Sequence, residues 1–152
     1  MATLKERINA DLKDAMKAKE ELKLSVLRML KSAIKYKEVE PGASQLDDTG
    51  VLQVMASLIK QRRDSVDQFK AAGHADRAEA EEKEIAILQG YLPQQLSADE
   101  LRAEVQAAIS ASGAKSAKDM GAVMKLLTPK LQGRAEGRAI SEEVKGQLSK
   151  LS

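Results

Sequence analysis

Two neighbouring motifs in the C-terminal part of the chain carry the residues best suited to chemistry. The first, Lys118 to Lys125, reads Lys-Asp-Met-Gly-Ala-Val-Met-Lys, and the second, at residues 133–138, reads Gly-Arg-Ala-Glu-Gly-Arg. Glycines allow close approach of the backbone to a ligand, and guanidinium groups bind anions through paired hydrogen bonds. Because neither motif contains an activated nucleophile, the pair predicts an anion-binding site rather than a catalytic centre.

The glycines of these motifs also have structural interpretations, which stay open at this stage. Gly133 suits a helix C-cap and Gly137 suits a turn, and the segment lacks the Gly-Lys-Ser/Thr ending of a phosphate-binding P-loop. Gly121 lies inside a predicted helix, where glycine costs about 1 kcal/mol relative to alanine. It therefore indicates close approach of another backbone or of a ligand, and we favour close helix packing.

The positive charge of the chain is concentrated around the same motifs. Residues 1–92 contain 16 Lys and Arg against 16 Asp and Glu, whereas residues 93–152 contain 9 against 7. Within residues 113–140 six cations face two acids, an excess of 6 − 2 = +4. The six are Lys115, Lys118, Lys125, Lys130, Arg134 and Arg138. This distribution favours an anionic partner such as nucleic acid.

The composition narrows the kind of partner and of chemistry. The chain has no cysteine and one histidine, His74, so we expect no disulfide, no metal site and no cofactor. Its three aromatic residues are too few to stack on many unpaired bases, so RNA would be recognised through its backbone and shape. No secretory signal or membrane-spanning run is recognisable, and we expect a cytoplasmic protein without a membrane partner. The cationic run Lys60 to Arg63 is interpreted as solvated helix surface.

Apolar residues recur with the helical period throughout, which predicts an all-α protein. Thr3 and Glu6 form a capping box, and Asp47, Asp48 or Thr49 can cap a long third helix. The predicted N-terminal domain spans residues 1–92 and contains about four helices. They run from about Leu4 to Ala18, from before Leu24 to before Glu40, over about six turns to Gly73, and from Ala75 to Gln89.

The segment from Gly90 to Leu96 contains a glycine and a proline and marks the predicted domain boundary. The C-terminal domain, residues 93–152, is predicted to contain three helices. Ser97 opens the first with a capping box, Ser116 precedes the second, and Ser141 caps the third. Pro129 is expected to kink or end the second of these helices.

Several of these segments together resemble the YqeY-like family over nearly the whole chain. The matching residues are Glu84, the hinge Tyr91 to Ser97, the run Lys118 to Gly121 and the loop Gly133 to Gly137. The family is similar to the tail of the B subunit of the tRNA-dependent glutamyl/aspartyl amidotransferase and to modules attached to some glutaminyl-tRNA synthetases. Two positions depart from its pattern: Ala122 stands where lysine is common, and Glu136 where aspartate is usual.

The resemblance implies a tRNA connection in which the C-terminal domain touches the tRNA body. We expect Lys118, Lys125, Arg134 and Arg138, with Gly133 and Gly137, to form the nucleic-acid-binding surface, and we assign no catalytic residue. One alternative is a helical adaptor that docks on an aminoacyl-tRNA synthetase or amidotransferase. Another, implied by resemblance alone, is carbon-nitrogen ligase activity with glutamine as amide donor, for which the chain shows no arranged nucleophile.

Overall fold

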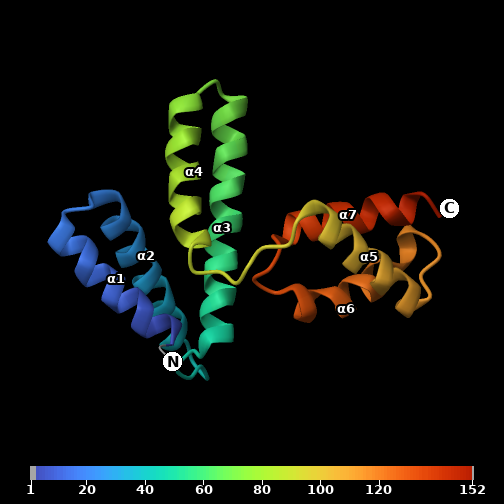
Figure 1. Cartoon of the computed structure of the whole chain (residues 1–152), viewed down its shortest axis with the longest axis horizontal. Coiled ribbons are helices and arrows are strands. Elements are labelled where there is room, and N and C mark those ends of the chain that lie inside the picture. The colour runs from blue at the N-terminus through green and yellow to red at the C-terminus, as the bar shows by residue number, and fades with distance from the viewer. Residues whose placement is uncertain (1–2, 152) are drawn as a thin grey trace. The chain divides into compact units, whose positions relative to one another are not determined.

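The computed structural model describes residues 3–151, and within them the chain forms seven α-helices, one short 3-10 helix and no strand (Figure 1). The predicted all-α class is therefore confirmed. The chain divides between Leu92 and Pro93 into two compact units, each described here by itself. Residues 1, 2 and 152 of the predicted domains lie outside the described residues, and the assignment of separate functions to two domains stays a prediction.

The N-terminal unit consists of four helices in two hairpins. They are α1 (Leu4–Ala18), α2 (Glu21–Glu38), α3 (Asp48–Ala71) and α4 (Ala75–Gln89). The capping box predicted at Thr3 is present, and Asp47 is the residue that caps α3. Gly73, with φ of +80°, occupies the left-handed conformation that turns α3 into α4. Because aromatic residues are scarce, aliphatic side chains fill this core, chiefly Ile8, Val26, Leu27, Leu30, Val51, Met55, Ile59, Ile85 and Leu88.

A set of polar contacts ties the start of α1 to the other helices of this unit. Glu38, at the end of α2, accepts a hydrogen bond from the Lys5 ammonium and another, of 2.8 Å, from the backbone N–H of Leu46. The backbone N–H of Leu4 donates to Asp48 Oδ1 over 3.0 Å. The bond from Lys5, and then the one from Leu46, lower the pKa of Glu38 below its usual value.

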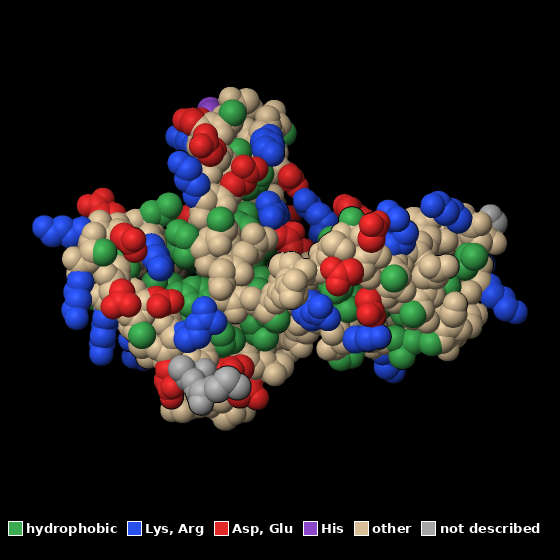
Figure 2. All heavy atoms as spheres, viewed as in Figure 1, with side chains coloured by type: hydrophobic (Ala, Val, Ile, Leu, Met, Phe, Trp, Pro, Cys, Tyr) green, Lys and Arg blue, Asp and Glu red, His purple; other side chains and the backbone are tan. Residues whose placement is uncertain are grey.

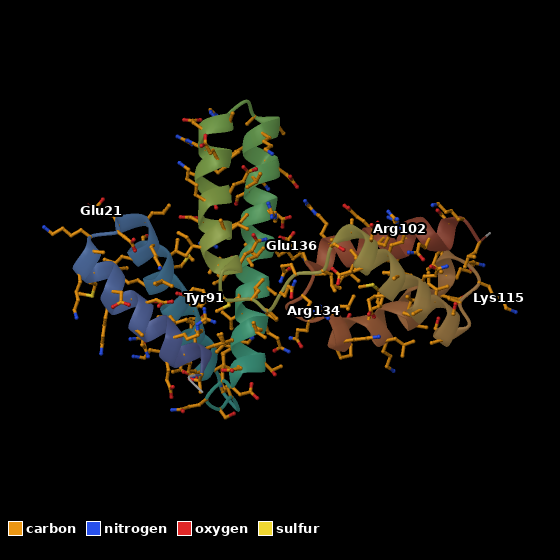
Figure 3. All side chains as sticks on the ribbon, viewed as in Figure 1. Glu21, Tyr91, Arg102, Lys115, Arg134 and Glu136 are labelled. Atoms are coloured by element: carbon orange, nitrogen blue, oxygen red, sulfur yellow. The ribbon has the colours of Figure 1, made fainter. Side chains whose placement is uncertain are left out.

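Tyr91 fastens the end of the N-terminal unit to α1. Its side chain is only 5% exposed, and its hydroxyl donates a 2.6 Å hydrogen bond to Asp11 Oδ2 (Figure 3). The Arg7 guanidinium lies 5.1 Å from the centre of the Tyr91 ring, within the range of a cation–π contact. Burial, and then the bond to Asp11, raises the pKa of Tyr91 above its usual value. The chain therefore leaves this unit from an anchored residue.

In the cationic run at residues 60–63, Lys60 and Gln61 are exposed as predicted, but Arg62 is not part of a solvated surface. The Arg62 side chain is 12% exposed, and its Nε donates to Glu84 Oε2 across the α3–α4 hairpin over 3.1 Å. Another of its nitrogens contacts the sulfur of Met29 on α2. Arg62 is thus an internal link between three helices, because α4 places Glu84 opposite it, a placement that residue spacing within α3 does not reveal.

The C-terminal unit packs three α-helices around a second aliphatic core. They are α5 (Ala98–Ser112), α6 (Met120–Leu131) and α7 (Gly137–Ser149), with the 3-10 helix η1 (Ala117–Asp119) leading into α6. The capping box predicted at Ser97 is present, and α6 ends two residues after Pro129. The core side chains are Val105, Ala108, Ile109, Val123, Leu127, Leu131, Ile140, Val144 and Leu148.

The predicted start of the last helix is wrong. α7 begins at Gly137, four residues before Ser141, so Ser141 lies inside the helix and does not cap it. The reason is the apolar seam: Ile140, Val144 and Leu148 recur every four residues, and all three are buried. Including Ile140 in the helix buries a side chain that a start at Ser141 would leave in a loop.

The lowered pKa of Glu38 makes part of the stability depend on pH. A carboxyl with a depressed folded-state pKa stabilises the fold above its unfolded pKa of about 4.3, and this contribution is lost as the pH falls through the folded value. We expect Glu38→Gln to lower the free energy of unfolding near neutral pH, with a difference from wild type that shrinks below about pH 4. Urea unfolding followed by circular dichroism measures this.

The control for this experiment is Glu40→Gln. Glu40 pairs with Lys37 at 3.4 Å in an exposed position, and such pairs contribute little to stability. A difference between wild type and Glu38→Gln that stays constant from pH 7 to pH 3 would contradict the assignment.

Candidate nucleic-acid interface

Helix α6 is amphipathic, and one of the predicted phosphate-binding residues, Lys125, lies on its polar side. Val123, Leu127 and Leu131 are buried against α5 and α7. At 100° per residue, Lys125 falls on the opposite side of α6. Lys118 precedes α6, in the 3-10 helix η1, and both lysines are exposed. Neither ammonium group makes an ion pair with any residue in the described range.

Lys130, which contributed to the charge excess, has a different role. Its ammonium lies 2.8 Å from Glu104 Oε2 on α5, so it joins the two helices. It lies about a third of a turn away from Lys125 around the α6 axis, since five residues correspond to 500°. The excess of positive charge that remains available to a ligand is therefore smaller than the +4 counted within residues 113–140.

The loop after α6 is held by the segment that precedes α5. Gly133 is buried with φ of +78°. The C-cap of α6 is Gln132, and Gly133 is instead the third residue of a turn that the Arg134 N–H closes on the Leu131 carbonyl over 2.9 Å. Gln95 Nε2 donates to the carbonyl of Gly133 over 2.6 Å, and the backbone N–H of Leu96 donates to the carbonyl of Arg134 over 2.9 Å. Two consecutive carbonyls of the loop are thus occupied, which fixes its conformation.

Arg134 is positioned by the same segment. Its Nε lies 3.4 Å from the carbonyl of Gln94, and its side chain is half-buried. Glu100, in the first turn of α5, has a lowered pKa, chiefly because it accepts hydrogen bonds within the Ser97 capping box and to a smaller extent because Arg134 is near. The guanidinium therefore has a defined orientation, and it shares its surroundings with a carboxylate.

Gly137 and Arg138 do not belong to a loop. They are the first two residues of α7, so the stretch from Gly133 to Arg138 is a short connection followed by a helix start. This corrects the interpretation of Gly137 as a turn residue. Arg138 is exposed at the helix end where the backbone dipole disfavours a cation by a few tenths to 1 kcal/mol.

The two motifs do not come together in one anion pocket. Lys118 lies just before α6 and Arg134 just after it, so the 12-residue helix, about 18 Å long, separates them. Figure 3 shows the same separation, with Lys115 and Arg134 at opposite ends of the unit. The residues of the two motifs are therefore spread over η1, α6, the connection after it and the start of α7.

Gly121 does not mark close helix packing. It is exposed, and a Cβ built on it would meet nothing within 4 Å. The favoured interpretation, close approach of a neighbouring backbone, is therefore wrong for the residues that the structure describes. Met120 and Met124, in contrast, are partly buried and pack against the core.

Gln95 also belongs to this site, although residue spacing did not indicate it. It lies in the hinge that carries the family resemblance, and its side chain bridges the carbonyls of Pro93, at 2.9 Å, and Gly133. A polar side chain two residues after a proline was the available signal. Its partner, 38 residues later in the chain, became visible only in the folded unit.

Among residues 3–151, no group of three or more His, Cys, Asp or Glu side chains is placed to share a metal ion. In the same part of the chain, no helix has the length and apolar character needed to cross a bilayer.

Comparison with known proteins identifies relatives over most of the chain. The family model described as Yqey-like protein matches residues 5–148. "Altered inheritance of mitochondria protein 41, mitochondrial" from Lachancea thermotolerans is 39% identical over 103 residues, which cover 68% of this chain and 54% of that protein. The protein of the same name from Kluyveromyces lactis is 40% identical over 84 residues, 55% of this chain and 45% of that protein.

These relatives bear on two points, the activity of the chain and its cellular location. The chain spans about half the length of the curated relatives it matches, so the activity of the whole relatives does not transfer to it directly. Their names place them in mitochondria, as does that of the Saccharomyces cerevisiae YJM789 protein, 36% identical over 87 residues, which are 57% of this chain and 47% of that protein. This finding contradicts the expected cytoplasmic location. That expectation rested on the lack of a recognisable secretory signal or membrane-spanning run, which is no positive signal for the cytoplasm.

The open surroundings of Gly121 lead to a prediction about stability. Gly121→Ala should raise the free energy of unfolding by about 0.5–1 kcal/mol, because alanine loses less backbone entropy in a helix. Gly146→Ala in α7 is the matched control, since a Cβ there also meets nothing within 4 Å. Urea unfolding of both variants measures the gain, and a destabilised Gly121→Ala protein would contradict the described surroundings.

Proposed function

Because the chain belongs to the YqeY-like family, we propose that it is a tRNA-binding accessory module that contacts the tRNA backbone through its C-terminal unit. The choice of tRNA comes from the resemblance of the hinge, the Lys118 motif and the Gly133 loop to the amidotransferase B-subunit tail. Under this proposal the chain supplies binding and orientation, and a partner protein carries any amide-transfer chemistry. That partner would be an amidotransferase or an aminoacyl-tRNA synthetase.

The observation that carries the proposal is the exposed side of α6. Lys118 lies in the 3-10 helix that leads into α6 and Lys125 lies in α6, seven residues later, and no ion pair within residues 3–151 neutralises them. Between them lie Gly121 and Ala122, both exposed and small. A sugar-phosphate backbone can therefore approach the helix closely while the two ammonium groups contact its phosphates.

The remaining predicted residues extend this surface beyond the end of α6. Arg134 is fixed beside the Gln94 carbonyl, and Arg138 stands in the first turn of α7, where the helix dipole also favours a phosphate. Such a row tracks a backbone without reading bases, in keeping with the scarcity of aromatic residues. Mitochondria carry their own translation machinery, so the mitochondrial names of the relatives are compatible with a tRNA partner.

The proposal predicts a salt-dependent affinity that falls when the α6 lysines are neutralised. For Lys118→Gln/Lys125→Gln, we expect weaker tRNA binding and a plot of log K against log salt whose slope is shallower by about 1 to 2, because each lost phosphate contact removes about one unit. Fluorescence anisotropy with a labelled tRNA transcript at 50 to 200 mM KCl measures both quantities.

The control double variant is Lys145→Gln/Lys150→Gln, which removes the same charge from exposed positions in and just after α7. Its slope should stay close to that of wild type. Absence of tRNA binding at low salt, or binding that salt does not weaken, would refute the proposal, and release of ammonia from glutamine by the pure protein would favour an enzyme instead.

Ala122 offers the converse prediction. It lies four residues after Lys118 and three before Lys125 on the exposed side of α6, at the position where the family pattern has lysine. Ala122→Lys should tighten tRNA binding and steepen the salt slope by about 1, since it adds one phosphate contact to the row. Ala122→Gln keeps the side-chain length without the charge and should leave the slope unchanged; equal effects of the two variants would contradict a phosphate contact.

A further inference from the structure

Positive and negative charges are unevenly distributed in the N-terminal unit, although its formal net charge is zero. Residues 3–39 contain ten Lys and Arg and six Asp and Glu, a net charge of 10 − 6 = +4. Residues 40–92 contain six and ten, a net charge of 6 − 10 = −4. The α1–α2 pair is therefore positive and the α3–α4 hairpin negative. In Figure 2, Lys and Arg side chains line the outer edge of the α1–α2 pair.

Helix α2 holds most of this positive charge. Residues 22–37 contain five cations and no acid, a local excess of +5, compared with +4 around the C-terminal motifs. Arg28, Lys31 and Lys35 are spaced by three and four residues, so they share one side of the helix, and all three are exposed. They cover about 10 Å of helix, enough to contact more than one phosphate of a nucleic-acid backbone.

These three cations are not neutralised within the unit. None of them makes an ion pair with a residue between 3 and 151. The acids that follow them are engaged elsewhere: Glu38 binds Lys5 and the Leu46 backbone, and Glu40 binds Lys37. Glu21 lies seven residues before Arg28, two turns away along the helix.

An exposed aromatic residue accompanies the cations. Tyr36 follows Lys35 directly and is 74% exposed, whereas the other tyrosine, Tyr91, is buried. An aromatic side chain in water has no packing role, and a base that stacks on it contributes about 1–3 kcal/mol to binding in nucleic-acid complexes. Cations at backbone spacing beside a free aromatic ring are the combination that binds unpaired nucleotides.

We propose that Arg28, Lys31 and Lys35 form a second RNA-binding surface, on the outer side of α2, with Tyr36 stacking on one unpaired base. The three cations contact phosphates of a segment that leaves a helical region, such as the edge of a loop. The choice of RNA as the anion rests on the proposed function, whereas the surface itself is independent of the C-terminal residues.

The chemistry of α2 favours RNA over an anionic membrane. A helix that lies in a membrane surface inserts its apolar side among the lipids. In α2 that side is already used, since Val26, Leu27, Leu30 and Ile34 are buried in the core. Its outer side combines the cations with Ser25 and Ser32, both exposed, which suit hydrogen bonding to a backbone better than burial in lipid.

The test uses the full-length chain and a labelled tRNA transcript in anisotropy titrations at 50 to 200 mM KCl. For Arg28→Gln/Lys31→Gln/Lys35→Gln, we expect at least about tenfold weaker binding at 100 mM salt and a salt slope shallower by about 2 to 3. Glutamine keeps helix propensity, so circular dichroism should show unchanged helix content. Arg28→Lys retains the charge and should keep the wild-type slope.

The matched control removes three cations from the negative hairpin of the same unit, as Lys60→Gln/Lys70→Gln/Lys83→Gln. Lys70 and Lys83 pair with Glu82 and Glu79, and the change in net charge equals that of the α2 variant. Its slope should remain that of wild type. Equal slopes for the α2 variant and wild type would overturn the second surface, and so would equal losses in the α2 and control variants.

The same titrations separate this inference from the proposed function. If Lys118→Gln/Lys125→Gln weakens binding and the α2 variant does not, the C-terminal interface stands and the α2 surface falls. If only the α2 variant weakens binding, the α2 surface stands and the C-terminal interface falls. Cosedimentation with phosphatidylserine vesicles that the α2 substitutions abolish, at unchanged tRNA affinity, would assign the surface to lipid and overturn the RNA assignment.

Tyr36 provides a test that does not depend on charge. Tyr36→Ala should weaken tRNA binding about fivefold or more with an unchanged salt slope, since stacking releases no counterions. Tyr36→Phe keeps the ring and should bind as wild type does. Unchanged affinity of Tyr36→Ala would overturn the stacking contact.

Discussion

The C-terminal unit depends on the burial of one side of α6. Val123, Leu127 and Leu131 occupy the centre of a core to which α5 and α7 each contribute three residues. With these three side chains directed inward, the helical period places Lys125 outward. The same burial fixes the end of α6, so that Gly133 can turn the chain back towards Gln95 and Leu96. The positions of the cations are therefore a consequence of apolar packing.

In the N-terminal unit, positive and negative charges are concentrated on different helices. Within the α3–α4 hairpin, Arg62 forms an ion pair with Glu84. Acidic residues outnumber basic ones in this hairpin. Helix α2 carries cations on its outer side while its inner side fills the core. Charges within about 10 Å act on each other and on a ligand at physiological salt, so a sum over the whole unit conceals what a partner meets locally.

The family match and the partial coverage of the curated relatives support different conclusions about this chain. The match over residues 5–148 includes both units, so the helices, the connection at Leu92 and the Gly133 loop belong to one shared pattern. The curated relatives are about twice as long as their matched parts. What their additional residues contribute is a property of those proteins, and the functional argument for this chain rests on its own exposed side chains.

The sequence by itself determined the all-α class, the capping boxes at Thr3 and Ser97, the glycine turn at Gly73 and the buried faces, because these follow from interactions between residues a few positions apart. Tertiary structure decided what depends on distant partners: Arg62 meets Glu84, Lys130 meets Glu104, and Gln95 holds the Gly133 loop. It also separated the two anion motifs by the length of α6 and opened the space around Gly121. Residue spacing fixes which side of a helix a side chain occupies, whereas only packing decides what lies opposite it.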